Sequence, residues 1–292
     1  MHATEADWRR LGAVAPDRLA PARLAAHWAV QLVAAAADAH LPCAADDSHT
    51  NLRWHDEHFA LVGNTLGDHL RIGLRMSDLN LLLLGEDGGV DDACGLVGKT
   101  LAEGMTWLEG HLERAGLEPA PLRRRDYAMP DHPVAGGAPF PRVDLRALEE
   151  LGCWFADASL VLEDRAGVDE RSTPIAAWPH HFDVGGILFL APAPGGSRPD
   201  APQIGYGLSP GDHHIAEPYL YVTPWPLRDA ALPPLASGRW HLEGFKGAVL
   251  PASEFVRSDY EDDHSGEQIA RFRGFFDAAI AAAEAMLTAA TA

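Results

Sequence analysis

Histidine and carboxylate side chains gather in the second half of the chain at a spacing that could hold a metal ion. The run Trp178-Pro179-His180-His181-Phe182-Asp183 leads into an expected strand, whose alternation places His181 and Asp183 on one face. A His-x-Asp pair on a strand, together with one distant histidine, is the ligand set of a facial triad for Fe(II). The candidate third ligands are His213, His214 and His241, with Asp212 and Glu217 as nearby carboxylates. The alternative is that these histidines are hydrogen-bonded packing groups beside Trp178 and Tyr219.

Residues Glu217 to Pro226 are rich in aromatic residues and prolines, and Trp240-His241 and Phe245 follow. Trp and Tyr side chains with few charges around them could line a pocket for an apolar or planar ligand. They could equally cover a sheet edge, where the prolines would block further strand pairing. The candidate ligand-binding residues are Trp178, Tyr206, Glu217, Tyr219, Tyr221 and Trp240.

Two motifs of nucleotide and hydrolase chemistry are matched only in part. The run from Gly95 to Thr100 lacks the first glycine of a phosphate loop, because Ala93 stands there, and it falls inside an expected helix. The run from Gly207 to Gly211 has the letters of a nucleophile elbow, but the residues after Ser209 cannot begin a helix. We therefore expect Ser209 to be a turn residue.

Polar residues of the first half have simpler interpretations. Neighbouring strand residues point to opposite faces, so Asp47, Ser48 and His49 cannot form a catalytic triad. The run from His55 to His58 does not match the spacing of a zinc-binding helix. Both runs predict solvated loops. The triplet Arg123-Arg124-Arg125 predicts a solvated arm or an internal salt bridge, with carboxylate or phosphate binding as the alternative.

Four helices are expected to position these side chains. The first runs from a cap at Asp17 to about Ala39, although His27, Gln31, Asp38 and His40 interrupt its apolar pattern. The second opens at Asp91, continues through Cys94 and Val97, and ends at Gly116. The third is capped by Asp144. The last, about His264 to Leu287, carries an apolar stripe typical of a helix docked on a core.

Strands and one irregular segment complete the pattern. Strands are expected from Asn51 onward, at 70–74 and 79–84, and then at 175–178, 184–190, 203–206, 219–223 and 248–250. Residues 118–142 hold six prolines and the pair Gly136-Gly137, which excludes a helix or a central strand there. This segment is a linker or a long arm wrapped over the surface.

The order helix, strands, helix occurs twice, and residues echo between the copies. Ser48 precedes Trp54 by six residues with His58-Phe59 following, and Ser172 precedes Trp178 in the same way with His181-Phe182 following. The fold class predicted is α+β, with two similar helix–antiparallel sheet–helix halves that could be an internal pseudo-twofold duplication. The expected division is a first half at 1–117, a Pro-rich connecting arm at 118–142 and a second half at 143–292, or one compact domain in total.

The second half resembles a known family. The series from Trp178 to Asp183, from Gly207 to Asp212, Glu217-Pro218-Tyr219 and from Gly244 to Pro251 recurs in this order in a widespread family of bacterial domains of unknown function. The resemblance covers about 175–252. It implies a shared structural unit, and it brings no activity or cofactor with it.

Composition excludes several classes of partner. The 292 residues hold 23 Lys and Arg against 42 Asp and Glu, a net charge of −19, so we expect no nucleic acid and no anionic membrane as partner. The start of the chain does not read as a secretory signal, and no run approaches a membrane span. Three scattered cysteines predict a reducing, cytoplasmic location. Lys99 and Lys246 are the only lysines, which fits a bacterial genome rich in GC.

Three hypotheses for function follow from these residues. The first is a protein that binds a small molecule in a cleft of the second half. The second is a metal-dependent oxygenase or hydrolase that uses His181, Asp183 and a third histidine, where the metal would activate O2 or a bound water. The third is a non-catalytic interaction module whose aromatic run meets a partner. The sequence does not decide whether the chain is an enzyme, and it leaves the oligomeric state open.

Overall fold

The computed structural model describes residues 5–190, 201–227, 232–256 and 264–289, and within these residues the protein is a mixed α and β fold. Four α-helices and eleven strands are described, and the strands pair antiparallel. The chain forms two compact units. Unit 1 comprises Met1–Arg18, Cys153–Ala176 and Asp183–Ala292, and unit 2 comprises Leu19–Gly152 and Ala177–Phe182. Short 3-10 helices lie at Glu5–Asp7, Pro16–Arg18, Ser48–Thr50, Asp56–His58, Pro133–Gly136 and Ala252–Glu254.

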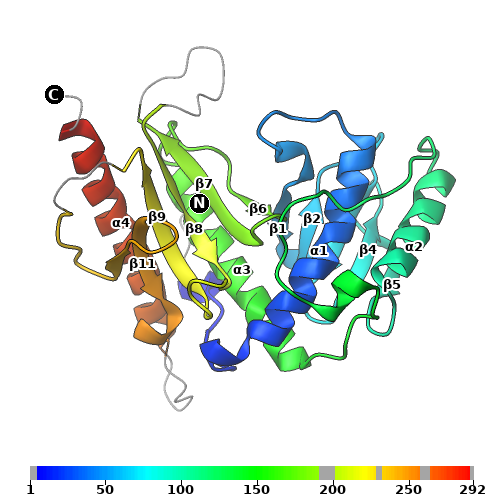
Figure 1. Ribbon diagram of the computed structural model, residues 1–292, viewed down its shortest axis with the longest axis horizontal. Coiled ribbons are helices and arrows are strands. Elements are labelled where there is room, and N and C mark those ends of the chain that lie inside the picture. Colours follow the sequence, from blue (N-terminus) through cyan, green and yellow to red (C-terminus); the bar gives the residue numbers. More distant parts are fainter. Residues whose placement is uncertain (1–4, 191–200, 228–231, 257–263, 290–292) are drawn as a thin grey trace. The chain divides into compact units, whose positions relative to one another are not determined.

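Unit 2 is an antiparallel sheet with two helices against it. Its strands are β1 (Leu52–His55), β2 (Ala60–Gly63), β3 (Arg71–Arg75), β4 (Asn80–Leu84) and β5 (Val90–Gly95), which neighbour one another in this order. A further strand, β6 (Ala176–Trp178), comes from much later in the chain and pairs with β1, Leu52 opposite Ala177. Figure 1 shows α1 (Ala20–His40) and α2 (Leu101–Arg114) side by side over these strands.

The expected helix from Asp91 to Gly116 is wrong in its first part. Val90–Gly95 is strand β5, in which Cys94 pairs with Leu81, and α2 begins only at Leu101. Gly98, with φ of +83°, turns the backbone between the strand and the helix. Thr100 then caps the helix through a reciprocal capping box with Glu103. The expected end is confirmed, because Gly116 follows the helix with φ of +85°.

The Pro-rich segment is an arm that packs within unit 2. The Trp28 indole of α1 donates to the carbonyl oxygen of Pro130 at 3.1 Å. The arm then returns to the end of the sheet, where Phe140 exchanges backbone hydrogen bonds with Gly98 and Lys99 at 2.9 and 2.8 Å. Aromatic anchors and backbone bonds therefore hold a segment that has no regular structure beyond one 3-10 turn.

Unit 1 is built on a second antiparallel set of strands. These are β7 (Asp183–Phe189), β8 (Gln203–Ser209), β9 (Tyr219–Trp225), β11 (Gly247–Pro251) and β10 (Arg239–His241), in that spatial order. The helix α3 (Leu145–Ala166) begins in unit 2 and enters unit 1 at Cys153. The last helix, α4 (Ser265–Ala289), packs along β8 and β9 (Figure 1). Its expected stripe is confirmed, since Ile269, Phe272, Phe276, Ile280, Ala283 and Leu287 are all buried.

Ser209 is the last residue of strand β8, where it pairs with Tyr219, so the expectation of a turn residue is wrong and the turn begins after it. Gly211 donates its backbone N–H to Ser209 Oγ at 3.2 Å, and its φ of +104° turns the chain back toward β9. Ser209 is buried, and no helix follows it. This turn therefore lacks the exposed serine and departing helix of a nucleophile elbow.

The amino-terminal segment of unit 1 is fixed to α4 by one buried amide. The Gln268 side chain accepts from Trp8 Nε1 and from the Leu11 N–H, both at 3.0 Å, and donates to the Leu11 carbonyl at 2.8 Å. The Trp8 ring also meets Phe272 edge to face. These contacts join residues more than 250 positions apart in the sequence.

Gln268→Leu should destabilise the protein by about 3 kcal/mol, because three hydrogen bonds are lost. The Trp8 and Leu11 groups that made them stay buried, where water cannot replace the lost partner. Chemical denaturation followed by Trp fluorescence measures the change, and limited proteolysis should cut before Leu11 more rapidly. Arg271→Leu, at an exposed position one turn further along α4, is the matched control and should change little. Equal stabilities for the two variants would contradict the role of Gln268.

Within the described residues, no helix is both long and apolar enough to cross a membrane.

Candidate functional site

The alternation of β9 separates its tyrosines from its core residues. Leu220 and Val222 are buried on the face toward α4, whereas Tyr219 and Tyr221 point to the opposite face of the sheet. On that opposite face, Ile215, Tyr219 and Val249 form a small apolar cluster, and Tyr221 and Phe245 pack against it. The candidate site is therefore built on the sheet face that lies away from α4.

The Tyr221 side chain lies over Gly185 and Gly207 and forms a hydrogen bond with Asp183. Its hydroxyl donates to Asp183 Oδ2 at 2.5 Å. A Cβ added to Gly207 or Gly185 would lie 2.6 or 2.7 Å from that hydroxyl oxygen, so the absence of side chains at these two positions makes room for the phenol. Burial and the negative charge of Asp183 raise the pKa of Tyr221 well above its usual value, which keeps the phenol protonated.

Tyr219 forms the matching pair with Asp212 on the β8–β9 connection. Its hydroxyl donates to Asp212 Oδ2 at 2.6 Å, while Asp212 Oδ1 accepts the backbone N–H groups of His214 and Ile215. Burial by itself raises the pKa of Asp212, but these hydrogen bonds outweigh it and leave the pKa below the ordinary value. Burial and the bond to Asp212 raise the pKa of Tyr219. Asp212 is thus held as an anion and Tyr219 as a neutral donor.

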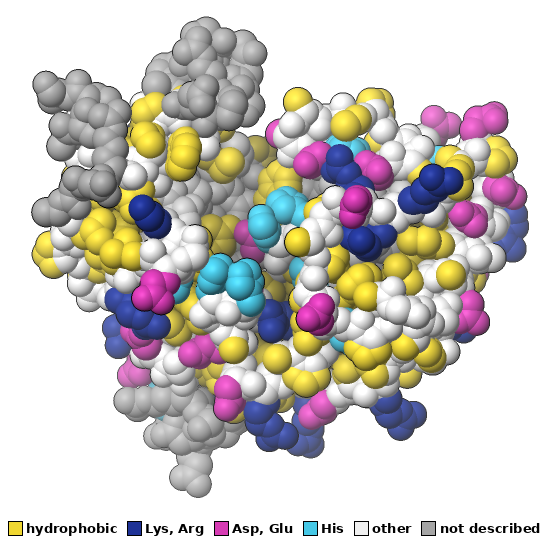
Figure 2. Space-filling model, in the orientation of Figure 1, with side chains coloured by type: hydrophobic (Ala, Val, Ile, Leu, Met, Phe, Trp, Pro, Cys, Tyr) yellow, Lys and Arg dark blue, Asp and Glu magenta, His cyan; other side chains and the backbone are white. Residues whose placement is uncertain are grey.

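Three further rings complete a group that we call the tyrosine–histidine cluster, defined as Tyr219, Tyr221, His214, His241 and Phe245. The Phe245 ring is stacked on Tyr219 at 5.9 Å and lies 4.5 Å from the His241 ring. His214 lies over Gly244, where an added Cβ would come within 2.0 Å of the imidazole. Figure 2 shows histidine side chains at the surface over the β8–β9 connection, in agreement with the exposure of His214.

His241 carries the unusual polar atom of the cluster. Its Nε2 is buried and has no hydrogen-bond partner among the described residues. Most buried polar atoms in native proteins are hydrogen-bonded, because leaving one unpaired costs about 1–3 kcal/mol.

The other predicted ligand-binding residues of unit 1 have structural partners. Tyr206 lies on the face toward α4, where it meets Phe276 and donates to Ser172 Oγ at 3.1 Å, so it is separated from Tyr219 and Tyr221 by the sheet. Glu217 accepts the N–H and hydroxyl of Ser253 at 2.7 Å. Trp240 donates its indole N–H to the Pro233 carbonyl at 2.7 Å.

Trp178 and His181 belong to unit 2, where their run is anchored on α1. The Pro179 carbonyl accepts from Gln31 Nε2 at 2.7 Å and from His27 Nε2 at 3.0 Å. The rings of His27 and Phe182 are stacked at 5.1 Å, and His180 makes ring contacts with Trp178 and His181. In this part of the chain, the histidines act as packing groups.

His27 and Gln31 were not expected as partners of the Trp178 run, and they form a buried network with Tyr127 from the Pro-rich arm. Tyr127 donates its hydroxyl to Gln31 Oε1. Burial lowers the pKa of His27 to about 4 and raises the pKa of Tyr127 to about 12, so both side chains are neutral near pH 7. The sequence did contain a sign of this network, because His27 and Gln31 are polar residues four positions apart in an otherwise apolar helix.

The candidate metal ligands do not gather as a facial triad requires. Across the described ranges, no group of three or more His, Cys, Asp or Glu side chains is placed to hold a metal ion. Asp183 is engaged by Tyr221, and the ring contacts of His213 and His241 are with His214 and Phe245. The expected strand alternation of His181 and Asp183 is wrong, because His181 lies in a turn after β6 and β7 begins only at Asp183, with the left-handed Phe182 between them.

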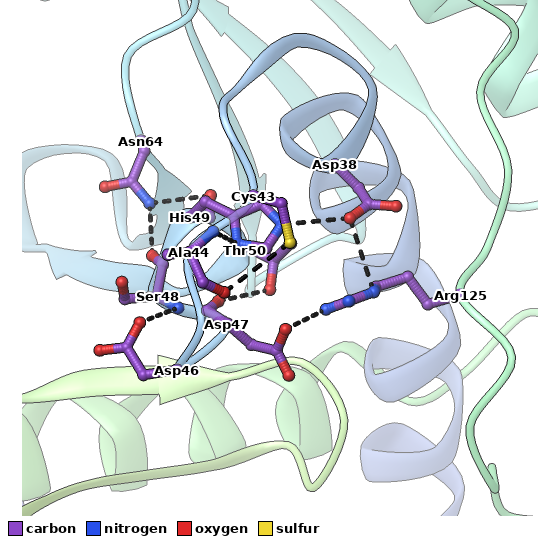
Figure 3. Close-up of polar contacts among 10 residues, drawn as sticks. All are labelled: Asp38, Cys43, Ala44, Asp46, Asp47, Ser48, His49, Thr50, Asn64 and Arg125. Carbon is purple, nitrogen blue, oxygen red and sulfur yellow. Dashed lines mark hydrogen bonds and ion pairs between the residues drawn. The ribbon is translucent and has the colours of Figure 1, made fainter. Parts of the chain in front are cut away.

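The polar run of the first half is a loop held by internal bonds (Figure 3). His49 lies between Asp38, 3.1 Å from its Nε2, and the Ala44 N–H, which bonds to its Nδ1 at 3.2 Å. Arg125 from the Pro-rich arm pairs with Asp47 at 2.7 Å and with Asp38 at 3.5 Å, which confirms the expected internal salt bridge. Since both His49 nitrogens are engaged, the imidazole is not available as a base for Cys43 or Ser48.

The fold and the cluster together define an antiparallel α+β protein with an aromatic, carboxylate-lined sheet face. Comparison of the chain with protein-family models, with curated proteins and with solved structures finds no match in any of the three. The resemblance of residues 175–252 to a bacterial family therefore stays a prediction, and the function is argued from the geometry of this chain.

Proposed function

We propose that the protein binds a small organic molecule at the tyrosine–histidine cluster of unit 1. The observation that carries the proposal is the buried, unpartnered Nε2 of His241 beside the Phe245 ring. Ligand sites typically combine apolar and aromatic walls with a few polar atoms that fix the orientation of the ligand. A planar molecule with one polar group would stack on the rings and satisfy the His241 nitrogen.

The exposure of the cluster is consistent with a ligand reaching it from solvent. Tyr221, His241 and Phe245 are half-buried and His214 is exposed, while Tyr219 is buried beneath them. The rings come from β9, from the β8–β9 connection and from the segment around β10 and β11. Because two of these segments are connections between strands, their side chains can move to fit a ligand while the strands keep their positions.

His241→Phe tests the proposal, because it keeps an aromatic ring and removes the nitrogen. Ligands would first be found by a thermal-shift screen of small planar compounds with the full chain. We expect their affinity for the variant, measured by titration calorimetry, to fall about fivefold to tenfold, the effect of one hydrogen bond of about 1 kcal/mol.

His69→Phe, on an exposed turn of unit 2, is the control for replacing a histidine by phenylalanine, and it should leave affinity unchanged. A screen without a ligand would contradict the proposal. Ligands that bind His241→Phe as tightly as the unaltered chain would contradict it equally.

The two alternative functions have less support. The metal-dependent enzyme requires three converging ligands, and the described residues offer no such group. The interaction module requires a contiguous apolar surface. The exposed large hydrophobic side chains of the described residues are few, and they are Val90, Val97, Leu145, Val168, Trp225 and Leu242.

We also propose that the two helix–strand–helix series derive from an internal duplication. Phe59, five residues after Trp54, and Phe182, four residues after Trp178, both adopt left-handed backbone conformations, with φ of +49° and +58°. Bulky residues rarely adopt this conformation, so its recurrence shortly after the echoing tryptophans supports common descent.

We further propose a cytoplasmic location. Its support is that Cys43, Cys94 and Cys153 are all free thiols.

A further inference from the structure

Residues 177–182, which we call the latch, belong to unit 2, although the residues on both sides of them in the chain belong to unit 1. Within the described residues, the pairing that joins the latch to β1 is one residue pair long, Leu52 opposite Ala177. One internal bond, from the Phe182 N–H to the Trp178 carbonyl at 2.7 Å, closes its turn. With so little strand pairing in unit 2, side-chain contacts with α1 carry much of its attachment there.

Two side chains of α1 hold one carbonyl group of the latch. The Pro179 carbonyl oxygen accepts from Gln31 Nε2 at 2.7 Å and from His27 Nε2 at 3.0 Å. The His27 ring is also stacked on Phe182 at 5.1 Å. A carbonyl oxygen only accepts, so neutral His27 carries its proton on Nε2, and a second proton would occupy Nδ1. His27 therefore both holds the latch and can bind a proton.

A second proton on His27 is unfavourable while the latch is closed. The residue is 7% exposed, and burial lowers its pKa to about 4. Arg23 on α1 and protonated His181 on the latch act as positive charges and disfavour the imidazolium further. The backbone carbonyls of Pro179 and His180 favour it, but by less than burial disfavours it. Closure of the latch and a charge on His27 are therefore in conflict.

The Pro-rich arm meets the same network with a neutral phenol. Tyr127 donates its hydroxyl to Gln31 Oε1, and burial raises the pKa of Tyr127 to about 12, so it stays protonated in acid. The Arg124 guanidinium lies 5.9 Å from the Tyr127 ring. Asp38, which acts on Tyr127, is itself paired with Arg125 at 3.5 Å. Tyr127 therefore brings no negative charge that would stabilise an imidazolium at position 27.

We propose that the latch is an acid-sensitive device, released from α1 when His27 binds a second proton. In the released state the imidazolium is exposed to water, so the cost of a buried charge is removed. Because the proton binds the released state more tightly than the closed state, acid shifts the equilibrium toward release. The change is local, since an element with few contacts opens at a lower free energy than the rest of its unit. The proposal concerns unit 2 and does not rest on the ligand site of unit 1.

Amide hydrogen exchange of the full chain, followed by mass spectrometry and corrected for intrinsic exchange rates, measures the release. We expect the opening constant of the latch to rise about 30-fold from pH 7.5 to pH 5, as the shift of His27 from 6.5 to about 4 requires. Low urea should barely change this constant, because little surface is exposed.

Strands β3 and β4 serve as the internal reference, because they pair continuously from Arg71 opposite Leu84 to Arg75 opposite Asn80. Their amides should open with the whole unit, so their opening constant should be at least about 100-fold smaller at pH 5 and should increase with urea. A latch with the same opening constant and urea dependence as β3 and β4 would overturn the proposal. A latch whose opening does not increase in acid would overturn it equally.

His27→Gln separates the proton from the hydrogen bond. Glutamine can still donate an N–H toward the Pro179 carbonyl but does not titrate, so the opening constant should change less than about threefold between the two pH values. His69→Gln, on an exposed turn of unit 2, is the matched control and should keep the full rise. A rise that survives His27→Gln would assign the proton to another group and refute the proposal. If that variant fails to fold, His27→Phe, which can keep the stack on Phe182, provides the same comparison.

Discussion

Between pH 7.5 and pH 5 the protein should lose about 2 kcal/mol of unfolding free energy through His27 alone. Burial holds the pKa of this histidine at about 4 in the folded protein, against 6.5 when the side chain is unburied. Between these values the unfolded chain binds the proton and the folded chain does not, so the free energy of unfolding falls as the pH is lowered. The loss approaches about 3 kcal/mol below pH 4, since each pKa unit corresponds to about 1.4 kcal/mol.

His27→Phe isolates this contribution from the other titrating groups. Phenylalanine can keep the stack on Phe182, and Gln31 still donates to the Pro179 carbonyl, so the variant should fold. At pH 7.5 we expect it to be less stable by about 1 kcal/mol, the effect of one lost hydrogen bond. Urea denaturation from pH 7.5 to pH 4.5 should show a shallower loss for the variant, and parallel curves for the two proteins would refute the assignment.

Gly207→Ala should destabilise unit 1 by about 3 kcal/mol and disrupt the Tyr221–Asp183 pair. The added Cβ would lie 2.3 Å from the Val184 carbonyl oxygen and 2.6 Å from the Tyr221 hydroxyl oxygen. The first atom belongs to the backbone of the paired strand β7, so the clash cannot be relieved by a change of rotamer. Thermal denaturation measures the loss, and the tyrosine ring signals in NMR spectra report displacement of Tyr221.

Gly205→Ala is a closely matched control, two residues away on the same strand and the same face. Its Cβ would meet Thr223 Oγ1 at 2.6 Å, while the nearest backbone atom, the Thr223 carbonyl oxygen, lies 3.9 Å away. The Thr223 hydroxyl can rotate away at the cost of its hydrogen bond to the Gly205 carbonyl, 3.3 Å long, so the loss should be about 1 kcal/mol. A similar loss of stability for both variants would show that strand glycines are needed for a reason other than the space beneath Tyr221.

The spacing of apolar residues predicted the helices and strands in which the buried side chains recur at the period of that element. The stripe of α4 and the continuous apolar run of β4 are both found where expected, because each buries side chains at the spacing of its own element. The start of α2 was misplaced because Cys94 and Val97 happen to stand at a helical spacing from Leu101. Strand pairing with β4 and the left-handed Gly98 decide that segment, and neither is visible in a local pattern.

The candidate site was predicted in part by residue type and in part missed. Tyr219 and Tyr221 were named together as candidate ligand-binding residues, and they share a face of β9 because residues at alternate positions of a strand point the same way. His241 was named as a candidate metal ligand, not as their neighbour. Tyr206 was assigned to the same group, but its register on β8 places it on the opposite face. Phe245 contributes to the cluster through a contact across strands that no spacing in the sequence encodes.

The discontinuous make-up of unit 2 has a consequence for the order in which the protein can be completed during synthesis. Residues 19–152 leave the ribosome before the six residues 177–182 that pair with β1 and supply the carbonyl bound by His27 and Gln31. Until that segment has emerged, the edge of β1 and three polar side chains of the network remain open to water. A fragment ending in the Pro-rich arm would stop at that stage, so residues far along the chain complete the unit that begins first.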